Sequence, residues 1–131
     1  MILVDTSIWI DHLHSSDARL TDLLGEDEVG SHPWVIAELA LGSMKHRAQV
    51  LDLLGNLWRF PVLSDGEVRT LVDRRKLWGR GLSVVDVHLL GAVALSAGSA
   101  LWTRDKRLLA ACRELGVSCV DEPGGRGRSR G

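Results

Sequence analysis

Residue types that mark whole classes of protein are scarce in this sequence. Its 131 residues include two cysteines, one phenylalanine, no tyrosine and three prolines. The cysteines, Cys112 and Cys119, do not form a Cys-x-x-Cys pair, which argues against a disulfide framework or a cysteine-based metal site. We therefore expect two reduced, partly buried thiols in a cytoplasmic protein.

Long apolar runs are also missing. No stretch approaches the roughly 18 apolar residues of a membrane-spanning helix, so we expect no membrane partner. The N-terminal stretch MILVDTSIWID reaches an aspartate at position 5 and is therefore not expected to be a signal peptide. The composition, 45% apolar and 25% charged without an internal repeat, is typical of one globular domain.

Charge is distributed unevenly along the chain. The formal net charge is −1, yet residues 122–131, EPGGRGRSRG, contain three arginines and one glutamate. A segment rich in glycine and arginine has no apolar face to bury, so we predict a disordered tail after a folded domain at residues 1–121. The tail could contact nucleic acid or act only as a solubilising segment.

Short apolar runs alternate with helix-like patterns. Strands are expected at residues 1–4, 29–31, 59–63, 100–103 and 117–120. The segments between them carry apolar residues at helical spacing, and several begin at capping residues. This alternation predicts an α/β domain with a central, mostly parallel sheet. In such a domain functional residues gather at the carboxyl ends of the strands.

Four acidic residues stand out by their positions. Asp5 and Asp105 each follow an expected strand and precede an expected helix, so both are good helix caps. Asp86 lies three residues after Ser83, in a relative of the capping box. Glu38 lies within a helix pattern and could simply face solvent. Each of the four has an ordinary structural explanation when it is taken alone.

Two of these acids lie in unusually apolar helices. Glu38 is the only charge in residues 33–42, and Asp86 is the only formal charge in residues 84–98. Helices that are apolar on nearly every side are expected to be buried, and a buried carboxylate costs several kcal/mol unless a partner compensates for it. Neither acid has a lysine or arginine one turn away. Mg²⁺ or Mn²⁺ would be a suitable partner for such oxygen ligands.

Topology could bring all four carboxylates together. Asp5 and Asp105 end strands at one edge of the expected sheet, and Asp86 and Glu38 lie near the starts of helices that begin at that edge. Carboxylates at close range raise one another's pKa values, and cations remove this repulsion. Two such ions about 4 Å apart can activate a water and stabilise the leaving oxygen of a phosphodiester.

Four motifs in this order resemble those of the PIN-domain ribonucleases: MILVDTSIWID, the glutamate in WVIAELALG, the aspartate in LSVVDVHLLGAVAL, and LWTRD. Within that family the sequence is similar to the VapC toxins of bacterial toxin–antitoxin pairs. The resemblance covers residues 1–121. It implies a PIN-like three-layer α/β/α fold with a mostly parallel five-stranded sheet, Mg²⁺ or Mn²⁺ as cofactor, endonucleolytic cleavage of RNA, and a homodimer. It also implies a VapB-type antitoxin whose C-terminal segment fills the acidic cleft.

The resemblance further implies roles for individual residues. The catalytic, metal-binding carboxylates would be those of Asp5, Glu38, Asp86 and Asp105. The supporting hydroxyl groups would be those of Thr6, Ser7 and Thr103. Capping and turn formation explain these hydroxyl groups equally well. His88 stands where the family more often has a small or aliphatic residue, and we expect it at the surface.

Basic residues beside the acidic centre are candidates for contacts with RNA phosphates. These candidates are Arg104, Lys106 and Arg80. A second basic group, Arg69 with residues 74–76, crowds one expected helix, although such a run is more often a solvated helix face. None of these residues reads base sequence, so the identity of the RNA stays open.

Two other functions remain open at this level. A non-catalytic PIN fold that only binds a partner would share the architecture, although the presence of all four acids argues against it. A Mg²⁺-dependent phosphotransfer domain also has an acidic edge on a doubly wound sheet. That domain needs an acidic pair after the first strand, and here only Asp5 occupies the position.

Overall fold

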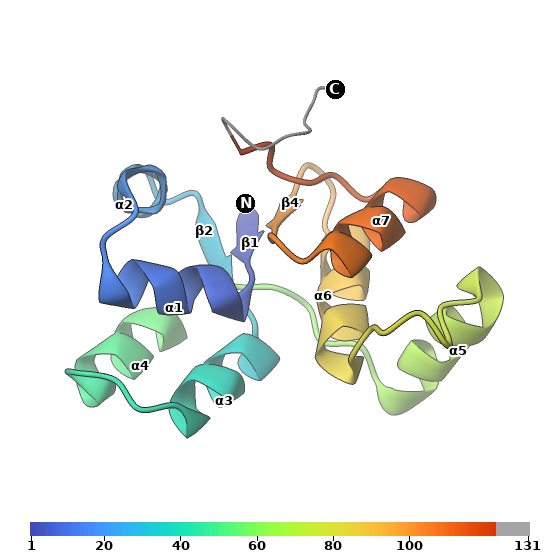
Figure 1. The fold of residues 1–131 in the computed structure, drawn as a ribbon, viewed down its shortest axis with the longest axis horizontal. Helices are drawn as coiled ribbons and strands as arrows, with labels where there is room; N and C mark the ends of the chain where they lie inside the picture. Colours follow the sequence, from blue (N-terminus) through green and yellow to red (C-terminus); the bar gives the residue numbers. More distant parts are fainter. Residues whose placement is uncertain (123–131) are drawn as a thin grey trace.

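Within residues 1–122, the part of the chain that the computed structural model describes, a four-stranded parallel sheet forms the centre of the molecule (Figure 1). The strands, in the spatial order β3-β2-β1-β4, are β1 (Ile2–Val4), β2 (Val29–Ser31), β3 (Trp58–Arg59) and β4 (Ala100–Trp102). Every pairing is parallel. The carboxyl ends of the strands therefore lie at one edge of the sheet.

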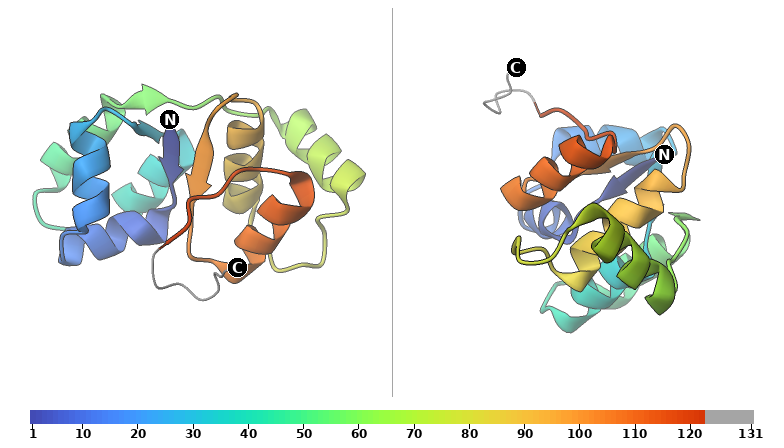
Figure 2. Two further views of the ribbon diagram at one scale, coloured as in Figure 1. Left: turned by 90° about the horizontal axis from the view of Figure 1, so that it is seen from above. Right: turned by 90° about the vertical axis from the view of Figure 1, so that its right-hand side faces the viewer.

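Helices flank the sheet and divide the molecule into two halves. In the described residues these helices are α1 (Thr6–His14), α2 (Ala18–Gly25), α3 (Pro33–Leu41), α4 (Arg47–Gly55), α5 (Asp65–Arg75), α6 (Val84–Ala94) and α7 (Lys106–Leu115). The first four lie in one half and the last three in the other (Figures 1 and 2). The strand–helix alternation that the sequence predicted is confirmed.

Helix starts follow local signals in the sequence. Ser64 and Ser83 each form a capping box, in which the serine hydroxyl accepts a hydrogen bond from the backbone N–H three residues on. The acid at that third position, Glu67 or Asp86, accepts in return from the serine N–H. These signals identified the starts of α5 and α6 correctly.

The core lies where the central strands meet the helices. Leu3 of β1, Leu101 of β4 and Leu108 of α7 have no exposed surface. Packing is close at Gly30 of β2, where an added Cβ would lie 2.5 Å from the ring of Phe60. This close packing fixes β2 against the residues at the end of β3.

The parallel α/β fold is confirmed, whereas the predicted fifth strand is reduced. Residues 117–120 meet β4 through a single bridge, at which Leu101 forms two backbone hydrogen bonds of 2.9 Å. The chain then reaches the guanidinium of Arg19, which donates to the carbonyl of Asp121 at 2.5 Å. This contact holds the chain to α2, and no longer ladder forms in the described residues. The third strand is also shorter than predicted, because Pro61 closely follows it and has no N–H to donate.

The predicted tail lies almost wholly outside the described residues. Of residues 122–131, only Glu122 is described, and its carboxylate accepts hydrogen bonds of 2.9 and 3.0 Å from Nε of Arg104. This contact lowers the pKa of the Glu122 carboxyl group. The division into a domain at residues 1–121 and a tail at residues 122–131 stays a prediction.

Cys112 is a buried free thiol and Cys119 a half-buried one, as predicted. Across residues 1–122, no helix combines the length and the apolar character needed to cross a membrane.

Candidate active site

Asp5 lies at the carboxyl end of β1 and begins α1. Its Oδ1 accepts a hydrogen bond from the backbone N–H of Thr6 (2.8 Å), so the residue is the helix cap that the sequence predicted. Its Oδ2 accepts from the hydroxyl of Thr103 (2.7 Å), and its backbone N–H donates to the carbonyl of Trp102 (2.9 Å). These contacts hold the carboxylate at the junction of β1 and β4.

Asp105 follows β4 and caps α7. Its Oδ1 accepts from the backbone N–H groups of Arg107 (2.9 Å) and Leu108 (3.0 Å). Its own N–H donates to the hydroxyl oxygen of Thr103 (3.1 Å), the same hydroxyl that donates to Asp5. The buried Thr103 hydroxyl thus fixes two of the four acids relative to each other.

Asp86 lies in the first turn of α6, the helix that precedes β4 in the chain. Its Oδ2 accepts from the N–H of Ser83 (2.9 Å), and its N–H donates to the Ser83 hydroxyl (3.1 Å). The capping box therefore sets the direction of this half-buried carboxylate as well as the start of the helix. The prediction that α6 is buried is correct, because every residue from 87 to 93 is buried.

Glu38 comes from α3 and meets Asp5 through an intermediate residue. Its Oε1 accepts a hydrogen bond of 2.5 Å from the hydroxyl of Thr6, the residue after Asp5. The prediction that Glu38 is buried is wrong, because its side chain is exposed. Apolar residues of α3 are exposed too, with Leu41 at 89%, so an apolar sequence did not make this helix buried on every side.

The four carboxylates share one electrostatic field. Burial, followed by the charges of Glu38 and Asp105, raises the pKa of Asp5, although the hydrogen bonds from Thr103 and Thr6 oppose this shift. Burial, followed by the charges of Asp5 and Asp105, raises the pKa of Asp86 against the opposing Ser83 contacts. Residues that lie up to 100 positions apart in sequence are therefore neighbours at the carboxyl edge of the sheet.

The oxygen atoms that remain suit a hard divalent cation. Asp5 uses both carboxylate oxygens for positioning, and each of the other three acids uses one. Among the described residues, three second oxygens have no hydrogen-bond partner: Glu38 Oε2, Asp86 Oδ1 and Asp105 Oδ2. Hard carboxylate oxygens in a strongly negative field are what Mg²⁺ and Mn²⁺ prefer. Within residues 1–122, however, no three acidic, histidine or cysteine groups are already close enough to hold one ion. Binding would draw these side chains closer together.

The three predicted hydroxyl groups differ in their surroundings. Thr103 contacts Asp5 and Asp105, and Thr6 contacts Glu38. Ser7 is exposed and makes no side-chain hydrogen bond to another described residue. The geometry thus gives Thr103 and Thr6 a positioning role and gives Ser7 none.

The predicted basic residues divide in a similar way. The guanidinium of Arg104 contacts three carboxylates, those of Asp11 (2.7 Å), Glu122 (2.8 Å) and Asp17 (3.4 Å). Arg80 forms a bidentate pair with Glu114 at 2.6 and 3.0 Å. Lys106 forms no ion pair in the described part of the chain. RNA contact by these three residues stays a prediction, and two of them already have carboxylate partners.

His88 contradicts its predicted surface position, because only 4% of its surface is exposed. Its ring lies 5.2 Å from that of Trp34 and 5.9 Å from that of His32, which has no exposed surface. His32 begins α3, and its Nδ1 accepts from the N–H of Trp34 at 3.1 Å. No sequence pattern predicts this pair, because the two histidines are 56 positions apart and meet only when α3 packs against α6.

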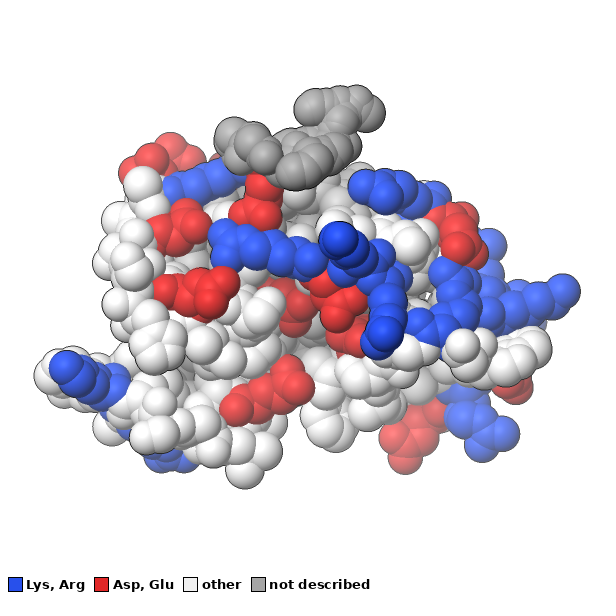
Figure 3. Space-filling view, in the orientation of Figure 1, with Lys and Arg blue, Asp and Glu red and all other residues white. Residues whose placement is uncertain are grey.

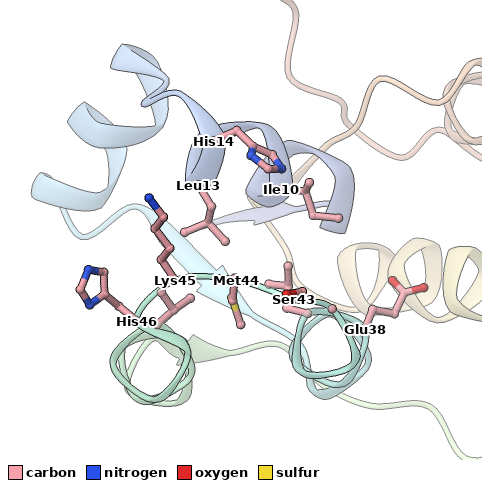
Figure 4. Close-up of a pocket in the computed structure, with 11 residues that line it drawn as sticks. Ile10, Leu13, His14, Glu38, Ser43, Met44, Lys45 and His46 are labelled. Atoms are coloured by element: carbon pink, nitrogen blue, oxygen red, sulfur yellow. The ribbon is translucent and has the colours of Figure 1, made fainter.

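A cavity of about 740 Å³ opens beside Glu38. Figure 4 shows it between α1, α3 and the segment that joins α3 to α4. Apolar side chains from these elements, including Ile10, Leu13 and Met44, face it, and Glu38 lies at one end. The lining also includes His14, Lys45 and His46, and Glu38 is the one acid of the proposed site that lines it.

Fold and site together define a class of protein: a parallel α/β domain whose carboxylates gather at the carboxyl edge of the sheet. Residues 2–114 match the PIN domain. The chain is also 65% identical over 122 residues to Ribonuclease VapC32 from two strains of Mycobacterium tuberculosis, CDC 1551 / Oshkosh and ATCC 25618 / H37Rv. These matches cover 93% of this chain and 98% of each relative. The chain therefore belongs to the PIN-domain family, and its relatives group it with the VapC members.

A solved structure agrees with this assignment at the level of the fold. The crystal structure of PAE2754 from Pyrobaculum aerophilum matches with a TM-score of 0.56 at 24% sequence identity. The match covers 84% of each chain. The likeness extends over most of the domain, and it concerns the fold alone.

Proposed function

We propose that this protein is a divalent-metal-dependent endoribonuclease and the toxin of a VapB–VapC-type pair. The observation that carries the proposal is the meeting of Asp5, Glu38, Asp86 and Asp105 in one electrostatic field. The name of the relatives that are 65% identical, Ribonuclease VapC32, supports RNA as the substrate class. The cofactor would be Mg²⁺ or Mn²⁺, and the protein is proposed to act as a homodimer.

The residues of the chain would act mainly by positioning. Thr103 and the N–H of Thr6 orient the carboxylate of Asp5, and Ser83 orients that of Asp86. The unused oxygen atoms of Glu38 and Asp105 complete the negative centre. A bound Mg²⁺ or Mn²⁺ would neutralise this centre, polarise a phosphodiester and lower the pKa of a water. Without that neutralisation, the four acids would repel the RNA backbone.

The experiment compares cleavage of labelled RNA by the protein and by its Asp5→Asn variant, with Mn²⁺ and with EDTA. We expect Asp5→Asn to cleave at least about 10²–10³-fold more slowly, as when one preorganised electrostatic group is removed from a site. EDTA should abolish cleavage by the unchanged protein. The matched control is Asp52→Asn, which removes an exposed aspartate of α4.

The outcomes separate the alternatives. Cleavage by Asp5→Asn at the rate of the unchanged protein would mean a contaminating nuclease or another site. No cleavage by any form, with Mg²⁺ or Mn²⁺, would favour the non-catalytic PIN fold. Cleavage that resists EDTA would remove the metal from the proposal and leave the ribonuclease.

The cavity next to Glu38 supports the proposed antitoxin partner. Apolar side chains line it, and two of them, Ile10 and Leu13, are 44% and 38% exposed. An apolar segment of a VapB-type antitoxin could fill this hollow and bring a basic side chain to Glu38 and its acidic neighbours. Such a partner would also block access to the negative centre.

The toxin role is tested by expressing the chain alone and together with the small protein encoded beside it. We expect growth arrest by the chain alone, no arrest by Asp5→Asn, and rescue by co-expression. Leu13→Asp should keep the arrest and weaken the rescue. Normal growth at high levels of folded protein would reject the toxin role without affecting the nuclease proposal.

A further inference from the structure

We propose that the guanidinium of Arg107 binds a backbone phosphate of the RNA beside the acidic centre, and that Gly81 keeps the space in which it lies. The inference rests on the proposed ribonuclease function and adds a phosphate-binding residue to it. No sequence pattern distinguishes Arg107 from the other arginines. Its contacts in the structure differ from those of Arg104 and Arg80.

The first observation is that the neighbouring arginines are occupied. Arg104 contacts three carboxylates, and Arg80 is held by both oxygens of Glu114. Arg107 is exposed and forms no ion pair with any described residue. Binding of a phosphate by Arg107 would therefore break no existing ion pair among residues 1–122.

The second observation is where the Arg107 side chain lies. A Cβ added to Gly81 would be 2.8 Å from Nη1, 2.9 Å from Cδ and 3.0 Å from Cζ of Arg107. The side chain therefore crosses from the first turn of α7 to the segment just before Ser83, the cap of α6. Asp105 caps α7 and Asp86 lies in the first turn of α6, so the Arg107 side chain spans the starts of the two helices that carry these acids.

The third observation is charge. Figure 3 shows acidic side chains near the centre of one face, with lysine and arginine side chains along one side of them. A cleaved strand must approach the acidic centre closely even though its own phosphates are negative. A guanidinium next to that centre supplies the attraction, and its planar fork fits two phosphate oxygens at once. Backbone contacts of this kind position a strand without reading its bases.

The test measures binding, so that it does not depend on cleavage. The probe is a fluorescent single-stranded RNA of mixed sequence, read by anisotropy and titrated in EDTA, which withholds the divalent cation that the proposed cleavage needs. We expect Arg107→Gln to weaken binding about eightfold at about 50 mM salt and to reduce the slope of log K against log salt by about 0.7, the value for one phosphate contact on a single strand. The matched control is Arg113→Gln, which removes the same charge from the last turn of the same helix and should leave the slope unchanged.

A glycine pair tests the geometry. Gly81 and Gly79 both have positive φ, 77° and 71°, so alanine strains both backbones equally, but only at Gly81 does the new Cβ meet Arg107. We expect similar losses of melting temperature in Gly81→Ala and Gly79→Ala, and weaker RNA binding in Gly81→Ala alone. The double variant Gly81→Ala, Arg107→Gln should bind no more weakly than Arg107→Gln.

The inference is overturned if Arg107→Gln binds like the unchanged protein or like Arg113→Gln, or if the unchanged protein does not bind the probe. It is also overturned if Gly79→Ala and Gly81→Ala weaken binding equally. Failure of the proposed function is seen separately, as unchanged cleavage by Asp5→Asn or no cleavage at all. If Arg107→Gln does not weaken RNA binding while cleavage still depends on Asp5, only this inference is rejected.

Discussion

Helices α3 and α6 each contribute to two polar clusters that respond to burial in opposite ways. Residues of α3 and its cap supply Glu38 to the acidic centre and His32 to the histidine pair, while α6 supplies Asp86 and His88. Burial raises the pKa of Asp86 and, together with His88, lowers the pKa of His32 to about 4. Both shifts have one cause, because burial disfavours whichever form of a group is charged.

The comparison teaches how a fold accommodates polar groups in different places. The histidine pair is sealed, so its members are neutral near pH 7 and Nδ1 of His32 serves as a helix cap. The acidic centre lies at an open edge, where Glu38 and Asp105 are exposed. A cation from solvent can reach the second cluster and cannot reach the first. One cluster is thus sealed inside the fold, and the other is open to solvent, as the proposed metal site requires.

The largest effect is expected for the histidine pair in acid. An unfolded histidine binds a proton near pH 6.5, whereas His32 in the fold binds one only near pH 4. The contribution of neutral His32 to the free energy of unfolding is therefore fully present above pH 6.5, and it is lost as the pH falls to 4. We expect the free energy of unfolding to fall by about 3 kcal/mol over this range. Urea unfolding followed by tryptophan fluorescence measures this change.

His32→Asn isolates that contribution, because asparagine can still cap α3 but does not titrate. The variant should lose about 3 kcal/mol less than the unchanged protein between pH 6.5 and 4. His46→Asn, at an exposed histidine, is the control and should follow the unchanged protein. Equal pH dependence in all three proteins would show that His32 is not the titrating group.

The next effect is expected at the acidic centre when metal is added. Mn²⁺ at 100 times its Kd should stabilise the fold by about 2.7 kcal/mol and raise Tm by about 10 °C. Asp86→Asn should abolish this rise. In EDTA near pH 7 the same variant should be at least as stable as the unchanged protein, because the raised pKa of Asp86 means that its ionised form opposes folding. Differential scanning calorimetry with Mn²⁺ and with EDTA tests both statements.

If Mn²⁺ raised the Tm of Asp86→Asn as much as that of the unchanged protein, the ion would bind elsewhere on the protein. A marked loss of stability by this variant in EDTA would mean that the capping contact of Asp86 outweighs the repulsion around it. Asp52→Asn serves again as the control and should keep the full response to Mn²⁺.

The smallest effect concerns the serine that positions Asp86. Ser83→Ala and Ser64→Ala remove equivalent capping boxes, so each should lower the free energy of unfolding by about 1 kcal/mol. Only Ser83→Ala should also weaken Mn²⁺ binding, since α5 carries no acid of the centre. Isothermal titration with Mn²⁺ compares the two variants. Equal metal affinity in both variants would show that the Ser83 cap stabilises the helix but does not help Asp86 bind the metal.

Prediction from sequence succeeded where the signal was local. The caps at Asp5 and Asp105 and the capping box at Ser83 were visible as short patterns, and the structure has all three. Prediction failed where burial depended on a distant element. Glu38 was expected to be buried and is exposed, whereas His88 was expected at the surface and is buried. Neither outcome could be read from helical periodicity, because both helices are apolar on nearly every side.

The sequence by itself determined where the helices begin and where the four strands lie, and it nominated the four carboxylates of the proposed site. Those features depend on hydrogen bonds and apolar spacing within a few residues. Only the tertiary structure decided that Thr103 joins Asp5 to Asp105 and that two histidines pack against each other. It also decided that, among residues 1–122, Arg104 forms ion pairs and Arg107 forms none. These facts depend on which distant side chains packing brings within a few ångströms, because charge and burial act through space and not along the chain.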